Sequence, residues 1–158
     1  MRDASGAGAD TAEAMLQPLA AVRAAGPARL EVAWADGTTM FVDLAAVLEA
    51  SLPLAPLRDP AVFAQARLGA EGFDVQWPGG IELAGDQLWR WGREQAGELM
   101  SAALFRAWRG RHNLSQNQAA RTLGLSLRMI KYYESGEKPI PKTIRLACIG
   151  ASVELASR

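Results

Sequence analysis

The feature that most constrains this chain is the stretch from Leu114 to Gly136, which predicts two short helices joined by a tight turn. Ser115 and Gln118 have the spacing of a capping box, in which each side chain accepts a hydrogen bond from a backbone N–H at the helix start. Gly124 follows where a left-handed residue ends a helix at little cost, and Ser126 predicts a second N-cap. The residues expected to pack between the helices are small or apolar: Ala119, Ala120, Leu123, Leu125, Ile130 and Tyr133.

Two helices held this close need a small residue where they cross, a glycine in the turn and an aliphatic residue after it. Ala120, Gly124 and Leu125 meet these three needs. The segment closely resembles the helix-turn-helix of the Cro/CI (XRE-type) DNA-binding family, over about residues 99–150. The resemblance implies an all-α, lambda-repressor-like domain whose second helix enters the major groove of double-stranded DNA. The alternative is an ordinary helical hairpin with a solvated charged face.

The resemblance also assigns roles to single residues. Gln116 opens the first helix of the motif, at the position that braces a phosphate in this family. Exposed residues early in the second helix meet base edges, and Leu127, Arg128 and Tyr132 occupy these positions. Arg128 suits a guanine, because its planar fork matches the O6 and N7 acceptors. The full set of predicted DNA-binding residues is Gln116, Ser126, Leu127, Arg128, Lys131, Tyr132 and Lys138.

The net charge of zero hides a division of the chain. Residues 1–96 hold 7 Arg and Lys against 13 Asp and Glu, a net charge of −6, whereas residues 97–150 hold 9 against 3, a net charge of +6. A basic segment that carries a helix-turn-helix is typical of a polyanion-binding module. The predicted organisation is a flexible tail at 1–17, a small α+β domain at 18–96, a helix-turn-helix domain at 97–150 and a C-terminal tail at 151–158.

The N-terminal domain begins with three short extended runs at residues 19–25, 28–34 and 38–44, and hydrophobic residues alternate clearly in the second and third. Gly26-Pro27 and Asp36-Gly37 separate them, and Asp-Gly between alternating runs is a strong hairpin signal. We expect a three-stranded antiparallel meander here.

Helices and a second hairpin are expected after the meander. Asp43 predicts the cap of a short helix, and three prolines then predict an irregular crossing loop. Residues 64–77 predict the hairpin, which a Pro-Gly-Gly segment ends. Asp86 predicts the cap of a helix that reaches about Gln95.

Residues 19–95 resemble an uncharacterised bacterial domain family that often precedes a Cro/CI-type domain or lies near toxin-antitoxin genes. The matching marks are the strand-turn-strand of Asp36 to Leu44, the L-x-D-P-x-x-F of Leu57 to Phe63 and the V-x-W-P-x-G of Val75 to Gly80. The resemblance implies a fold, and it brings no known activity.

The segments beside the motif predict two more helices. Residues 98–111 predict the first helix of the DNA-binding domain, which Asn113 can end. Residues 139–141 predict a rigid turn, and Pro141 then opens a helix to about Ile149. The sequence departs here from the five-helix pattern of the family, because too few residues remain for a full last helix.

Signals for an enzyme are weak. His112 is the only histidine, so neither a Ser-His-Asp set nor a two-histidine metal site can form within one chain. Cys148 is the only cysteine and is expected to be a buried thiol. The sequence therefore predicts no catalytic residue, no metal and no cofactor. No apolar run approaches the ~20 residues of a membrane span and residues 1–10 lack a signal peptide, which makes the cytoplasm the expected location.

The function expected from these observations is that of a homodimeric bacterial transcriptional regulator that binds DNA sequence-specifically. One alternative is an antitoxin-like protein, whose acidic domain binds a partner such as a basic toxin while the helix-turn-helix represses the shared promoter. A further alternative is a small-molecule sensor or enzyme in the N-terminal domain.

Overall fold

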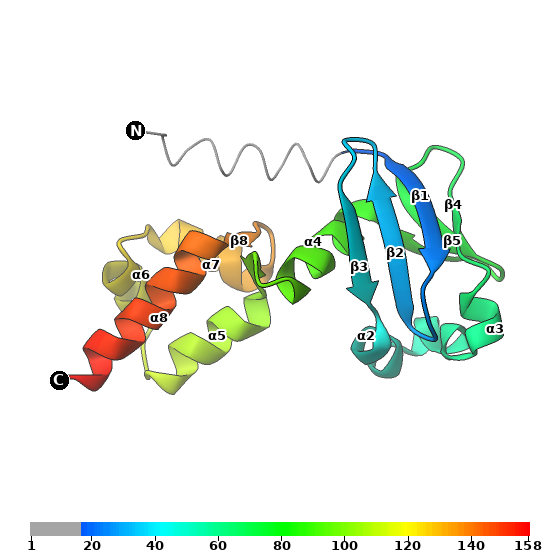
Figure 1. Cartoon of the computed structure of the whole chain (residues 1–158). Helices are drawn as coiled ribbons and strands as arrows, with labels where there is room; N and C mark the ends of the chain where they lie inside the picture. The colour runs from blue at the N-terminus through cyan, green and yellow to red at the C-terminus, as the bar shows by residue number, and fades with distance from the viewer. Residues whose placement is uncertain (1–16) are drawn as a thin grey trace. The chain divides into compact units, whose positions relative to one another are not determined.

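Residues 17–158 are described by the computed structural model, and the chain divides into two units between Gln95 and Ala96 (Figure 1). The tail expected at residues 1–17 lies outside the described part except for its last residue. Within residues 17–158, no helix combines the length and the apolar character that crossing a membrane requires.

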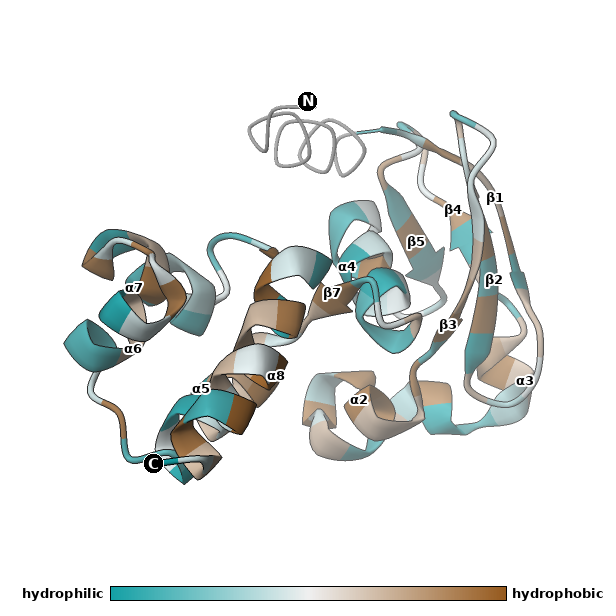
Figure 2. Ribbon diagram, turned by 60° about the vertical axis from the view of Figure 1, so that its left-hand side comes forward, coloured by the Kyte–Doolittle hydropathy of each residue, from teal (hydrophilic) through white to brown (hydrophobic). Residues whose placement is uncertain are grey.

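The first unit opens with an antiparallel sheet in the order β1 (Leu19–Ala24), β2 (Arg29–Trp34) and β3 (Thr39–Asp43). This meander confirms the prediction from the alternating runs. Leu30, Val32 and Trp34 are buried on one side of β2, while Glu31 and Ala33 between them face the other side. Figure 2 shows the alternation as brown and teal bands along the strands.

Short helices occupy the segment where a crossing loop was predicted. α2 (Ala45–Ala50) is followed by the 3₁₀ helix η1 (Leu52–Arg58) and by α3 (Pro60–Phe63). The prediction that the prolines exclude regular structure is wrong. Pro53 and Pro60 lie in the first turns of η1 and α3, where the fixed φ of the ring suits a helix and no N–H is needed.

Two predicted caps lie one position away from their helix start. Leu44 is the N-cap of α2, and the carboxylate of Asp43 accepts from the N–H of Ala45 at 2.8 Å. α4 (Gly85–Gln95) begins one residue before Asp86, which therefore lies in the first turn of the helix. A carboxylate near a helix N-terminus is favourable in either position, so the sequence does not distinguish them.

The second sheet has one strand more than predicted. β4 (Arg67–Leu68), β5 (Asp74–Trp77) and β6 (Ile81–Ala84) pair in this order, all antiparallel. The Pro-Gly-Gly segment ends β5, as predicted, and it is also the turn into the additional strand β6. Gly79 and Gly80 have φ of 88° and 78°, a left-handed conformation that reverses the chain at little cost in glycine.

α4 packs on the first sheet and closes the core of this unit. Leu88 and Trp89 are buried, and Trp89 meets Trp34 edge to face with ring centroids 5.1 Å apart. Gly92 lies directly over β3, since a Cβ at this position would lie 3.1 Å from Met40 Sδ. A side chain at this position would be in tighter contact than usual, so Met40 would have to shift by a few tenths of an ångström to admit it.

In the second unit, a short strand precedes the first helix and pairs with another that lies just before the last helix. β7 (Leu99–Met100) pairs antiparallel with β8 (Ile140–Pro141). The predicted helix start at Glu98 and the predicted rigid turn at 139–141 are therefore wrong. The pairing joins residues about 40 positions apart, which local sequence patterns do not reveal.

α5 (Ala102–Arg111) begins after Ser101, whose hydroxyl accepts from the N–H of Leu104 at 3.1 Å. α6 (Gln116–Leu123) and α7 (Leu127–Ser135) follow, as the capping signals predicted. The helical second unit and the mixed first unit confirm the expected fold class, an α+β domain followed by a lambda-repressor-like domain.

α8 (Lys142–Ala156) is longer than predicted. It continues past Ile149 through most of the segment where a C-terminal tail was expected. Pro141 is its N-cap rather than its first helical residue. The indole Nε1 of Trp108 on α5 donates to the carbonyl oxygen of Cys148 and to Ser152 Oγ, both at 3.0 Å. Contacts of this kind extend the helix past Gly150, since packing rather than propensity stabilises most helices.

Two helical glycines allow a test of the α4 packing. Gly92→Val should lower the free energy of unfolding of the first unit by about 1 to 3 kcal/mol, because the new methyl groups would overlap Met40. Gly110→Ala should instead stabilise the second unit by about 0.5 to 1 kcal/mol, since nothing outside the adjoining residues and helix backbone lies within 4 Å of its Cβ position. Denaturant unfolding of the full chain measures both, and equal effects of the two substitutions would contradict this packing.

Candidate nucleic-acid interface

The helix-turn-helix is held at each of its ends by side-chain or glycine caps. Ser115 and Gln118 form both hydrogen bonds of the capping box, at 2.8 and 3.1 Å. Gly124 ends α6 with a φ of 69°, and Ser126 Oγ accepts from the N–H of Met129 at the start of α7. Gly136 ends α7 with a φ of 78°. These caps fix where each helix begins and ends.

The inner side of the motif is apolar and closely packed. Ala119 and Ile130 are fully buried, and Tyr133 packs edge to face on Phe105 of α5 with ring centroids 5.8 Å apart. The predicted inner residues Ala120, Leu123 and Leu125 also belong to this core or pack against it. The surface of α7 that faces away from this core is therefore the one left for a ligand.

One carboxylate joins three helices beneath this surface. Glu134 on α7 forms a two-point ion pair with Arg109 on α5 and accepts from Gln116 Nε2 on α6 at 2.7 Å. Arg109 also donates to the carbonyl oxygen of Leu114 at 3.0 Å, and Arg106 donates to the carbonyl oxygen of Glu134. The arrangement ties the start of α6 to the end of α7.

The environment of Glu134 favours its charged form. Burial by itself would raise the pKa of the carboxyl, but the hydrogen bonds from Arg109 and Gln116 and the charges of Arg109 and Arg106 outweigh burial. The pKa of Glu134 is therefore lower than its ordinary value of 4.5.

The outward side of α7 carries a cluster of two cations and one ring. Arg128 Nε donates to Tyr132 Oη at 2.6 Å, and its guanidinium carbon lies 5.2 Å from the ring centroid. Lys138, which follows α7, places Nζ 4.8 Å from the same ring. Both are within the range of cation–π attraction. We call Arg128, Tyr132 and Lys138 the cation–ring cluster.

The other predicted site residues lie around this cluster. Arg128 and Lys131 are exposed, as predicted, whereas Leu127 and Tyr132 are half-buried. The hydroxyl of Ser126 is used by the helix cap, and one amide hydrogen of Gln116 is used by Glu134. Local sequence patterns do not reveal the roles of Glu134, Arg109 and Arg106, because their contacts link residues 18 to 28 positions apart.

Cys148 and His112, the side chains most suited to nucleophilic or metal chemistry, take part in packing and hydrogen bonding within the second unit. Burial raises the pKa of the Cys148 thiol to about 11, which makes it a poor nucleophile. His112 lies at the end of α5 with Nε2 2.9 Å from Ser152 Oγ. Within residues 17–158, no group of three or more His, Cys, Asp and Glu side chains is placed to hold a metal ion.

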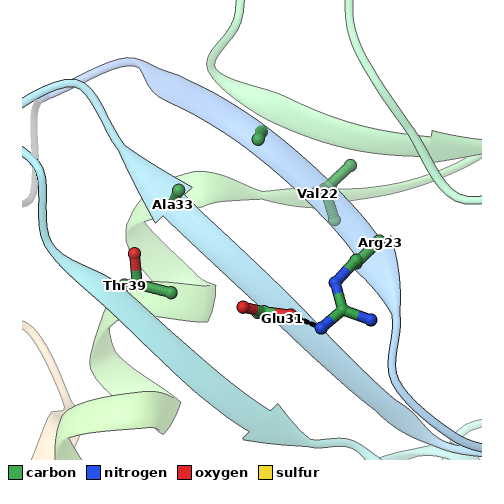
Figure 3. Close-up of a pocket in the computed structure, with 6 residues that line it drawn as sticks. Val22, Arg23, Glu31, Ala33 and Thr39 are labelled. Carbon is green, nitrogen blue, oxygen red and sulfur yellow. Dashed lines mark ion pairs between the residues drawn. The ribbon is translucent and has the colours of Figure 1, made fainter.

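A shallow hollow lies on the outer side of the first sheet of the first unit, with a volume of about 160 Å³ (Figure 3). Arg23 and Glu31 form an ion pair across its rim. Its remaining lining residues are Ala21, Val22, Ala33 and Thr39. The hollow contains one carboxylate, already paired, and so it lacks the two carboxylates of an acid–base pair.

These features define a two-unit helix-turn-helix protein. A family model described as "Helix-turn-helix" matches residues 105–147, and a model described as "Protein of unknown function (DUF2442)" matches residues 19–94. The chain belongs to the family in which a DUF2442 domain precedes an XRE-type helix-turn-helix, which confirms the resemblance seen in the sequence.

A crystal structure from Nitrosomonas europaea ATCC 19718 is similar over most of the chain. It is described as that of a "Putative DNA Binding Protein" and is 40% identical in sequence, with a TM-score of 0.53. The match covers 85% of this chain and 86% of that chain. No curated protein matches the sequence significantly.

Replacement of Glu134 tests the three-helix contact. Because its pKa is lowered in the folded state, Glu134 contributes stability above pH 4.5 that is lost as the pH falls through the folded-state pKa. Glu134→Gln should therefore destabilise the second unit by about 1 to 3 kcal/mol at neutral pH. The difference from wild type should shrink in acid.

The measurement is denaturant unfolding of the full chain across pH, with amide exchange of α6 and α7 to assign the transition. Glu137→Gln is the matched control, because Glu137 is exposed two residues after α7 and should change stability little. A Glu134→Gln deficit of equal size at all pH values would contradict the charged contact.

Proposed function

We propose that this protein is a transcriptional regulator that binds DNA sequence-specifically, with α7 in the major groove. The observation that supports this most is the cation–ring cluster, which lies on the outward side of a helix whose inner side is fully packed. A cation beside an aromatic ring at the start of a capped helix is suited to base edges, and the neighbouring cations are suited to phosphates.

Charge and fold support the same assignment. Residues 97–150 carry a net charge of +6, which favours a polyanion because neutralised phosphates release counterions. The similar crystal structure carries a DNA-binding description, and the family model is that of a helix-turn-helix. We assign no catalytic role to the chain and propose the bacterial cytoplasm as its location.

Individual roles follow from the contacts. Arg128 uses only Nε in its hydrogen bond to Tyr132, and its terminal nitrogens make no hydrogen bond within the described residues. We assign these two nitrogens to O6 and N7 of a guanine. Leu127 suits a thymine methyl group, and Lys131 suits a phosphate or a base edge.

Phosphate contacts are assigned to the rim of the interface. Gln116 keeps a second amide hydrogen after its bond to Glu134, and this N–H can donate to a phosphate at the α6 N-terminus. Lys138, on the far side of the Tyr132 ring, supplies a further positive charge. Ser126 caps the N-terminus of α7 and so positions that helix. We also assign it a contact with the DNA backbone beside the helix start.

The acidic first unit favours one second function, the binding of a protein partner. Residues 1–96 carry a net charge of −6, and exposed Phe41 stacks with Arg29, whose guanidinium carbon is 4.1 Å from the ring centroid. An aromatic residue beside Arg is typical of interface anchors. An antitoxin-like regulator, which binds a basic toxin and represses the shared promoter, combines both functions.

Selection of bound duplexes from a random DNA pool tests the main proposal. One recognition helix reads only a few base pairs, so we expect a homodimer and a pseudo-palindromic site with half-site centres about 10 base pairs apart or a multiple of it. Recovery of no preferred sequence would contradict sequence-specific binding, and a single unrepeated half-site would contradict the dimer.

A double-mutant cycle tests the roles of Arg128 and Tyr132. Arg128→Ala should lose about 1 to 3 kcal/mol of binding on the selected duplex, concentrated at one base pair, and Arg128→Lys should not restore it. Tyr132→Phe retains the ring and removes only the hydroxyl that orients Arg128. It should therefore weaken binding in the wild type and have little effect beside Arg128→Ala.

Titrations at fixed salt on selected and random duplexes measure these changes. Arg111→Ala is the control, because Arg111 is an exposed cation at the end of α5, outside the motif. A uniform loss on both duplexes that Lys rescues would make Arg128 a phosphate contact instead of a base reader.

A further inference from the structure

The strand β3 forms one edge of the first sheet. The sheet has the order β1, β2 and β3, so β3 has a hydrogen-bonded neighbour on one side only. The other edge strand, β1, lies against β4, and the N–H of Leu19 at its start donates to the carbonyl oxygen of Gly72 at 2.7 Å (Figure 1). An edge strand presents a row of backbone N–H and C=O groups with which another strand can pair.

The pairing with β2 fixes which residues of β3 point outward. Just after β3, the N–H of Leu44 donates to the carbonyl oxygen of Ala28 on the β2 side. Such bonds recur at every second residue of an antiparallel pair, so the even-numbered residues of β3 bond to β2. The odd-numbered residues, Thr39, Phe41 and Asp43, therefore point their N–H and C=O groups away from β2.

One of these three positions is already occupied as a further strand would occupy it. The N–H of Asp43 donates to Gln95 Oε1 at 2.8 Å, and Gln95 Nε2 donates to the carbonyl oxygen of Asp43 at 2.7 Å. The side-chain amide of Gln95 thus makes both bonds that the backbone of a neighbouring strand would make. Within residues 17–158, the outward groups of Thr39 and Phe41 have no such partner.

A row of small side chains crosses the outer face of the sheet from this edge. Thr39 pairs with Ala33 of β2, and Ala33 pairs with Ala21 of β1. These three residues line the shallow hollow, and Figure 3 shows Thr39 and Ala33 on neighbouring strands beside the ion pair of Arg23 and Glu31. The row gives a long side chain of an added strand a path from β3 across the sheet.

The charges on this face favour a basic occupant. The two arginines of the sheet are engaged, Arg23 by Glu31 and Arg29 by the ring of Phe41. The carboxylate of Glu31 can accept from a further donor beside Arg23, because a carboxylate offers about four acceptor sites. The net charge of −6 on residues 1–96 attracts a basic segment over a longer range.

We propose that the β3 edge is the docking site for an extended basic segment of a partner protein, which adds a fourth strand to the first sheet. The inference rests on the partner-binding function proposed for the first unit and names its surface. Backbone bonds to Thr39 and Phe41 supply affinity, and alternate side chains supply specificity. A Lys or Arg opposite Thr39 lies along the small row and reaches Glu31. The side chain opposite Phe41 packs on a ring that is 47% exposed.

Peptides selected from a displayed random pool for binding to the full chain serve as the probe. We expect enrichment of peptides with Lys or Arg at alternate positions. In one selected peptide, N-methylation of single backbone amides should weaken binding at least about threefold at every second residue and little in between, since only alternate N–H groups face β3. Enrichment of no basic peptide, or an N-methyl scan without this period of two, would overturn the proposal.

Two substitutions at position 39 test the same bonds from the side of the protein. Thr39→Pro removes the outward N–H and no bond to β2, as edge strands tolerate, whereas Thr39→Val keeps this N–H. With matched unfolding midpoints, the Pro variant should bind the selected peptide at least about fivefold more weakly than the Val variant. Equal binding by the two variants would contradict pairing at the edge.

Amide exchange of the wild-type chain tests the edge without any substitution. Saturating peptide should slow the exchange of the Thr39 and Phe41 amides. The amides of Val22 and Ala24, which point outward from β1, are the control and should change little. Equal slowing at both edges would count against the proposal. Slowing at Thr39 and Phe41 that grows with protein concentration and needs no peptide would make a second copy of the chain the occupant instead.

These outcomes are distinct from failure of the partner-binding function. If Glu31→Gln weakens peptide binding and β3 gains no protection, the first unit binds a basic partner and the edge proposal fails. If no basic peptide is enriched, the edge proposal fails and the partner function requires a folded basic protein as its ligand. The DNA-binding function is measured on duplexes and is independent of both results.

Discussion

The helix-turn-helix of this protein depends on the carboxylate of Glu134, which is shared by three helices. A half-buried charge is costly unless it is paired and hydrogen-bonded, and Arg109 and Gln116 supply both. The pair leaves little freedom in the angle between α6 and α7, since both oxygens are engaged. Because the cation–ring cluster lies on α7, its position relative to α6 is set by the contact of Glu134 with Arg109 and Gln116, in which no residue of the cluster takes part.

Local signals were sufficient to predict the motif itself. Ser115, Gln118, Gly124 and Ser126 act within a few residues of themselves, so their capping roles can be inferred from spacing alone, and the structure has each of them as predicted. Elements that depend on distant partners were mispredicted. β7 exists only because β8 lies beside it, and β6 was missed because its four residues carry too short a pattern to separate from a turn.

The sequence predicts which residues lie on the outward surface of α7, but it does not predict the contacts that these residues make with one another. The 3.6-residue period places Arg128 and Tyr132 one turn apart, which is why both were expected on one side. It does not indicate that the hydroxyl of one orients the other, or that Lys138 returns to the same ring from beyond the helix end. The sequence determines the order of these side chains along the helix. Which of them could contact a base and which orient a neighbouring side chain depends on the three-dimensional geometry.

The two parts of the chain carry opposite net charges, and salt screening limits how far the acidic first unit can weaken DNA binding. Residues 1–96 and residues 97–150 carry equal and opposite net charges of −6 and +6, but salt at physiological strength screens such charges beyond about 8 Å. An acidic unit farther than this from bound DNA would change affinity little, although it would still slow the long-range approach of the phosphate backbone at low salt. The acidic unit therefore weakens DNA binding chiefly when it lies close to the DNA. A basic partner that neutralises the unit would remove this repulsion. Regulation through such a partner would consequently show its largest change in the association rate and would fade as the salt concentration rises.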